Sequence, residues 1–117
     1  MAPKLAIDIH NDAADLLQAP INFSSVGSNQ VLAGVPGAII RIYKIFFIVG
    51  ASTNITYQDG TSFSAINVSG PLAFAASEGM VLDFDTKPWL TCGSGNSFIL
   101  NQSGTAQVSG IVYYTQG

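Results

Sequence analysis

Two groups of acidic residues have spacings that would suit chemistry. Asp83 and Asp85 would lie on one face of a strand, and paired carboxylates hydrolyse glycosidic bonds when they are held at the right separation. Neighbouring acids on one strand face are more often a solvated rim. Asp8, His10 and Asp12 would share one face of an extended segment, but one histidine among hard carboxylates makes a weak metal site. Neither group therefore predicts an active site.

Nucleophilic catalysis has equally little support. Cys92 is the only cysteine, so it can form neither an intrachain disulfide nor a cysteine-cluster metal site, and we expect a small buried side chain. A catalytic thiol or serine would need a base, and His10 is the only histidine. Nucleophile-elbow, P-loop and dinucleotide-binding motifs are missing from the sequence. We expect no enzyme, no cofactor and no metal.

The composition limits the class of partner. The chain has 117 residues, which suits one domain, and only 9% are charged, against roughly 25% in an average protein. A net charge of −3 with only 4 lysines and arginines disfavours nucleic-acid binding. A surface poor in charge repels itself weakly, which suits packing against neighbours. No secretion signal or membrane helix is recognisable, so we expect synthesis in a host cytoplasm and no membrane partner.

From Pro20 onward the sequence predicts β-structure. Short segments with period-two alternation are separated by Gly, Pro, Asn and Ser, which indicates about eight to ten short strands. Such a chain is typical of an all-β, single-domain β-sandwich or jelly roll. Asp59-Gly60 predicts a type I′ hairpin turn with a return strand over 61–68.

Residues 38–49 predict a long strand that is apolar on both faces. Strict alternation places Ile40, Ile42 and Lys44 with Phe46 and Ile48 on one face. A small antiparallel sheet normally exposes one face to water, so this strand needs a cover on both sides. The sequence therefore predicts assembly with further copies. The expected subunit interface comprises Ile40, Ile42, Phe46, Ile48 and Tyr113.

Residues 1–19 differ from the remainder and are expected to form an N-terminal arm, with the sandwich domain over 20–117. Asp8, Asp12 and Asp15 make this segment acidic. A short helix over 12–18 and an extended segment over 4–9 both fit the pattern, and Pro20 ends any helix. The expected contacts of the arm with a shell or a neighbour are Leu5, Ile7, Ile9, Leu16 and Leu17.

The aromatic side chains allow two interpretations. Trp89, Tyr43, Tyr57, Tyr113 and Tyr114 could form a platform for a sugar or a partner. Aromatic residues also dominate cores and oligomer interfaces, which is the interpretation we favour.

Several short phrases between residues 38 and 114 stand in a characteristic order. They are Asn54-Ile-Thr-Tyr-Gln-Asp-Gly60, Gly70-Pro-Leu-Ala-Phe-Ala-Ala76, Glu78-Gly79-Met-Val-Leu82, Pro88-Trp89, Ser97-Phe-Ile-Leu-Asn-Gln-Ser103 and Val108-Ser-Gly-Ile-Val-Tyr-Tyr114. The ordered set resembles small virion proteins of tailed bacteriophages. The acidic arm and Cys92 depart from that pattern.

The resemblance implies a β-sandwich or jelly-roll subunit, often a trimer, on the outside of a capsid or tail. Its partners would be the major capsid protein and further copies of itself, and the pattern carries no catalytic residues. We expect a capsid decoration (cement) protein on the exterior of the virion. The alternative is a tail or head-fibre module that binds host-surface glycans through exposed aromatic side chains.

Overall fold

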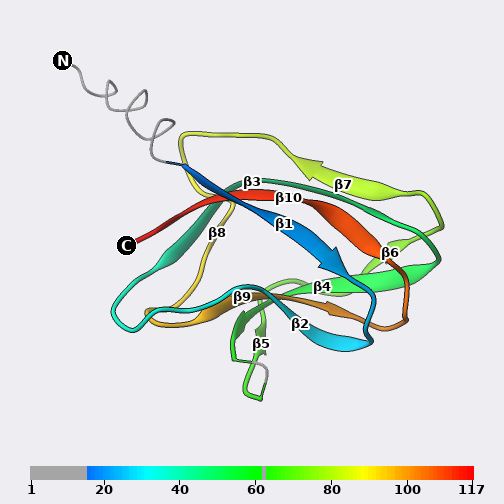
Figure 1. Cartoon of the computed structure of the whole chain (residues 1–117), viewed down its shortest axis with the longest axis horizontal. Helices are drawn as coiled ribbons and strands as arrows, with labels where there is room; N and C mark the ends of the chain where they lie inside the picture. Colours follow the sequence, from blue (N-terminus) through cyan, green and yellow to red (C-terminus); the bar gives the residue numbers. More distant parts are fainter. Residues whose placement is uncertain (1–15, 62) are drawn as a thin grey trace.

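The computed structural model describes residues 16–61 and 63–117, and it is all-β over this range (Figure 1). The strands in chain order are β1 (Leu17–Phe23), β2 (Gly27–Leu32), β3 (Ile40–Val49), β4 (Thr53–Gly60), β5 (Ile66–Asn67), β6 (Leu72–Phe74), β7 (Gly79–Leu82), β8 (Leu90–Thr91), β9 (Ser97–Gln102) and β10 (Val108–Gln116). Within the described ranges, no helix has the length and apolar character needed to cross a bilayer.

The strands form two antiparallel sheets that pack face to face. Sheet A has the order β1-β10-β3-β7, with β8 also paired to β3. Sheet B has the order β2-β9-β4-β5, with β6 also paired to β4. The chain passes from one sheet to the other at each step from β1 to β4. At its end, β9 lies in sheet B between β2 and β4, and β10 lies in sheet A between β1 and β3. This connectivity is that of a jelly roll, which confirms the predicted β-sandwich class.

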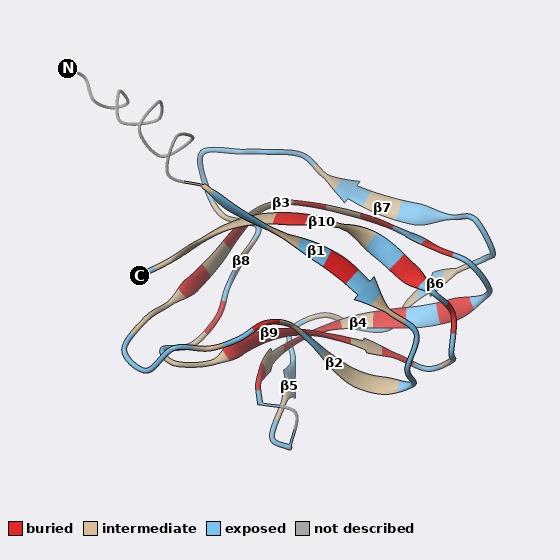
Figure 2. Cartoon of the chain, viewed as in Figure 1, coloured by how far each residue is buried: buried red, intermediate tan, exposed pale blue. Residues whose placement is uncertain are grey.

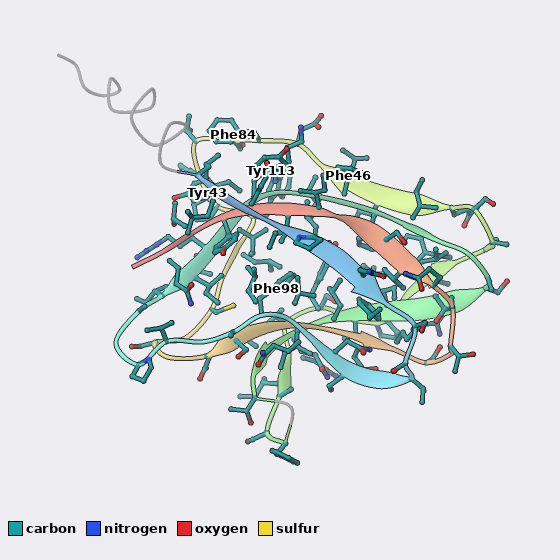
Figure 3. All side chains as sticks on the ribbon, viewed as in Figure 1. Tyr43, Phe46, Phe84, Phe98 and Tyr113 are labelled. Atoms are coloured by element: carbon teal, nitrogen blue, oxygen red, sulfur yellow. The ribbon has the colours of Figure 1, made fainter. Side chains whose placement is uncertain are left out.

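The hydrophobic core fills the space between the sheets (Figure 2). Phe98 of β9 lies there, fully buried, and its ring centroid is 6.1 Å from that of Tyr57 (Figure 3). Phe47 of β3 makes an edge contact with Phe74 at 5.4 Å between centroids. A single copy of the chain thus has a closed core of its own.

A β-bulge in β3 decides which side chains enter that core. Tyr113 of β10 pairs with Lys44, but the next residue, Tyr114, pairs with Ile42, so Tyr43 is the extra residue. The bulge shifts the alternation and turns Lys44 to the outer face. Strict alternation had placed Lys44 with Ile40 and Ile42, and this prediction is wrong because a buried, unpaired ammonium group would be costly. The buried residues of β3 are Ile40, Ile42, Ile45, Phe47 and Val49.

The hairpin after β4 also differs from the prediction. Asp59 and Gly60 are the last residues of β4 rather than the turn, because they pair with Phe98 and Ser97 of β9. The return strand β5 contains only Ile66–Asn67. Gly60 still has a positive φ of 139°, and a Cβ there would overlap the carbonyl oxygen of Ser64. Glycine is therefore required at the start of the loop, although the predicted turn type is wrong.

The sheet begins earlier than the predicted domain boundary. β1 starts at Leu17, so residues 17–19 of the expected arm are part of sheet A, where they pair with Tyr114 to Val112. Leu17 is exposed at the start of this strand. β1 is an edge strand, which explains how it accommodates Pro20. The predicted contacts Leu5, Ile7 and Ile9 lie outside the described residues.

Candidate functional site

The two described carboxylates that were considered for catalysis, those of Asp83 and Asp85, lie on an exposed segment. Asp83 and Asp85 follow the end of β7 and are exposed, and Asp85 Oδ1 accepts a hydrogen bond from the Thr86 amide at 2.6 Å. Asp8, His10 and Asp12 lie outside the described ranges. Within 16–61 and 63–117, no three histidine, cysteine or acidic side chains are grouped in a way that could hold a metal ion.

Cys92 is buried, as the sequence predicts. Burial, together with the nearby Asp59 carboxylate, raises the pKa of its thiol to about 11. Asp59 Oδ2 accepts a hydrogen bond from the Gly93 amide at 3.0 Å, while Oδ1 is buried without a hydrogen-bond partner among the described residues. At neutral pH the thiol is protonated, so it is a packing side chain and not a nucleophile.

Stability is expected to fall at alkaline pH because of Cys92 and Tyr57. Burial raises the pKa of Cys92 from 9.0 to about 11 and that of Tyr57 from 10.0 to about 12. Both groups keep their proton to a higher pH in the folded chain than in the unfolded chain. Above pH 9 the unfolded chain therefore binds fewer protons than the folded chain, and stability is lost as pH rises. Denaturant unfolding should show a loss of roughly 2–4 kcal/mol between pH 8 and pH 11. The Cys92→Ala variant should lose less than half as much, because at pH 11 the unfolded cysteine has ionised further than the unfolded tyrosine, and equal losses in both proteins would contradict this origin.

The outer face of sheet A carries a row of apolar side chains across four strands. The strand registers align Pro20 of β1 with Ile111 of β10, Ile111 with Phe46 of β3, and Phe46 with Val81 of β7. Ile48, two residues beyond Phe46 in β3, lies on the same face and extends this row. Ile48 and Val81 expose 54% and 63% of their surface. We call Pro20, Phe46, Ile48, Val81 and Ile111 the apolar row.

Polar residues and aromatic rings border the apolar row. Lys44 Nζ lies 5.6 Å from the centroid of the Tyr113 ring on the same face. Tyr43, the bulge residue, stacks on Phe84 with 6.2 Å between the ring centroids (Figure 3). On the other side, Asn22 and Ser109 share a register line with Ile48. An apolar centre with a polar rim, and with aromatic side chains in the patch, is the usual anatomy of a protein interface.

The outer face of sheet B is different because its polar side chains bond to one another. Ser28 Oγ donates to Gln58 Oε1 at 2.7 Å, and Gln58 Nε2 donates to Asn67 Oδ1 at 2.8 Å. Asn101 Nδ2 donates to Ser28 Oγ at 3.1 Å. Ile99, whose register partners are polar, is fully buried on this face. The outer face of sheet B is therefore mainly polar, and that of sheet A is apolar.

The structure divides the predicted subunit interface into two groups. Ile40 and Ile42 are fully buried in the core of the single chain, so their assignment to a subunit contact is wrong. Phe46, Ile48 and Tyr113 lie on the outer face of sheet A, and their contact with another copy stays a prediction. Sequence reasoning missed Pro20, Val81 and Ile111 as their neighbours, although Ile111 and Tyr113 are two residues apart in one strand and so share a face.

The other aromatic residues also separate by position. Tyr57 is in the core and Tyr114 packs against the core, whereas Trp89 is exposed, with its indole N–H donating to the Asp83 carbonyl oxygen at 2.7 Å.

The strongest candidate site is therefore the outer face of sheet A. Comparisons of the chain with protein-family models, with curated proteins and with solved structures found no match.

Proposed function

We propose that this chain is a non-enzymatic structural protein of a tailed-phage virion that decorates the exterior of the capsid and strengthens it. Copies would contact one another through the outer face of sheet A. The observation that carries the proposal is the apolar row, which crosses four strands and has a polar rim. A face of this kind is stabilised by a protein cover and is poorly suited to water.

The fold and the ordered phrases support the same class. Jelly rolls are used by viral capsid domains and by lectins, so both expected functions are compatible with this connectivity. Because fold alone does not determine function, the choice between them depends on the surfaces. The apolar row favours a protein contact, and the phrases over 38–114 resemble virion proteins.

The dimensions of sheet A indicate a modest self-association. The strands β1, β10, β3 and β7 are on average about 25 Å long, and side by side the four of them are about 19 Å wide. Two copies would then bury roughly 1,000 Å² in total, the lower bound for a specific interface. Weak contacts suffice when many copies are held side by side on a shell, because avidity multiplies them. In a trimer, as the resemblance implies, the same face of each copy would instead surround the threefold axis and bury part of its area against each neighbour.

Heating capsids with and without the protein tests the proposal. Empty shells of the parent phage, saturated with this chain, should rupture at a temperature several degrees above that of bare shells, because each bound copy stabilises the intact shell. Light scattering and dye access to the lumen measure the rupture. A shell incubated with heat-denatured protein is the control, and equal rupture temperatures would contradict a cement function.

A glycan-binding module is the second candidate, favoured by the exposed rings of Trp89 and Phe84. Such a module would leave the rupture temperature unchanged and would bind host polysaccharide in a manner that depends on Trp89. The same preparation therefore separates the two candidates.

A further inference from the structure

The β-bulge in β3 turns two consecutive side chains to the outer face of sheet A. Ile42 and Ile45 are both buried, and the two residues between them, Tyr43 and Lys44, are not. In a regular strand one of these two neighbours would point into the core. Bulges are frequent next to active sites, where they redirect a side chain. The surroundings of Tyr43 are therefore a candidate binding site.

Two further aromatic side chains lie beside Tyr43. The Phe84 ring stacks on the Tyr43 ring, with 6.2 Å between their centroids (Figure 3). The Trp89 amide donates to the Ile42 carbonyl oxygen at 2.7 Å, which brings Trp89 next to the bulge. Leu90 packs against the core, so the preceding Trp89 side chain points outward. We call Tyr43, Phe84 and Trp89 the aromatic platform.

The rings of the aromatic platform are accessible and are held in place. Trp89 and Phe84 expose 47% and 38% of their surface. The indole N–H of Trp89 donates to the carbonyl oxygen of Asp83 at 2.7 Å, so the indole is tied to the residue that precedes Phe84. Phe84 is supported in turn by the Tyr43 ring. Side chains that are ordered before a ligand arrives lose little conformational entropy on binding.

The chemistry of this surface indicates the class of ligand. One face of a pyranose ring presents C–H bonds, which pack against the electron-rich face of an aromatic ring. Charged side chains of both signs occur in the two segments that carry the platform, and they are Arg41, Lys44, Asp83, Asp85 and Lys87. Charged groups make strong hydrogen bonds to hydroxyl groups. Their opposite signs nearly cancel, which favours a neutral ligand over a polyanion such as a nucleic acid.

We propose that the aromatic platform binds a neutral saccharide chain, with pyranose rings stacked on Trp89 and Phe84. Tyr43 is a positioning residue that supports the Phe84 ring. Jelly rolls occur in lectins as well as in capsid domains, so the fold is compatible with such a site. A neutral chain is a narrower class than the glycan-binding candidate requires. The platform does not rest on capsid decoration, because a decoration protein and a fibre module could each carry it.

Fluorescence titration of the full chain tests the proposal, because Trp89 is the only tryptophan and reports directly on the platform. The probes are neutral hexasaccharides of glucose, galactose, mannose and N-acetylglucosamine. At least one should shift the emission in a saturable manner, with a dissociation constant of roughly 0.1–1 mM because only a small area is buried. Phe84→Ala should weaken binding by about tenfold. Tyr43→Ala should weaken it by about threefold, and Tyr43→Phe should restore it.

Phe63→Ala is the matched control, since Phe63 is an exposed phenylalanine outside sheet A, and it should bind as wild type does. Circular dichroism checks that every variant keeps its strand signal. Absence of a shift with all four hexasaccharides, unchanged binding in Phe84→Ala, or equal weakening in Phe63→Ala would overturn the platform. A shift with a polyuronate or a proline-rich peptide alone would identify another ligand and also overturn it. No shell is present in this measurement, so the saccharide site and the decoration function can fail separately.

Discussion

Replacing Gln102 by leucine is expected to lower the free energy of unfolding by about 3 kcal/mol. Gln102 is only 1% exposed and is the last residue of β9. Leucine fills nearly the same volume, so no cavity forms. The loss comes from the hydrogen bonds that the amide makes to three separate segments.

Oε1 and Nε2 of the Gln102 amide each have two hydrogen-bond partners. Oε1 accepts from Thr53 Oγ1 at 3.0 Å and from the Ala106 amide at 3.1 Å. Nε2 donates to the carbonyl oxygens of Ala106 and Ser25 at 2.9 and 3.1 Å. The side chain thus joins the β1–β2 loop, the start of β4 and the loop before β10. Leucine would leave these polar groups unpaired, mostly away from water, and the penalty for a group left unpaired exceeds the value of the bond itself.

Denaturant unfolding of wild type, Gln102→Leu and Gln107→Leu measures this effect. Gln107 is a matched control because it is an exposed glutamine whose Nε2 donates to Asn22 Oδ1 at 2.7 Å on the surface. Water can replace that partner, so the control should lose less than about 1 kcal/mol. Similar losses in the two variants would show that the buried network contributes little.

Sequence alone predicts the sandwich but not the outward face of its longest strand. Period-two alternation and turn residues are local signals, and they identified most strands correctly. The bulge at Tyr43 is not local, because it exists only in the pairing of β3 with β10, where two residues face one. A single inserted residue exchanges the faces of the strand beyond it. For this reason Ile40 and Ile42 were predicted at an interface and lie in the core.

The apolar row and the Gln102 network could not be predicted from the sequence for a related reason. The row contains one residue from each of β1, β10 and β7 beside the two from β3, and only the registers of all four strands bring them together. Gln102 comes after the apolar segment 98–100, where a polar residue is typical of the end of a strand. Its burial depends on the loops that close over it, which no local pattern shows.

Changing Phe46 and Ile48 to threonine is expected to abolish self-association. Both side chains lie on the outer face of sheet A, and threonine is β-branched, which suits a strand, while it removes most of the apolar surface. The interface is near the minimum size, so the loss of two central side chains should weaken association by at least 100-fold. Analytical ultracentrifugation over a wide concentration range measures the change.

The control carries a loss of exposed apolar surface outside sheet A. Val26→Thr with Val35→Thr removes two exposed apolar side chains from loops outside sheet A and should leave the oligomer intact. Circular dichroism should show the same strand signal in all three proteins, because the core residues of β3 point the other way. If wild-type protein is monomeric at every concentration, or if the loop variant dissociates as readily as the sheet variant, the apolar row is not the contact between copies. A folded variant that is monomeric in solution and yet still decorates shells would show that this face serves the contact between copies and is not needed for binding to the shell.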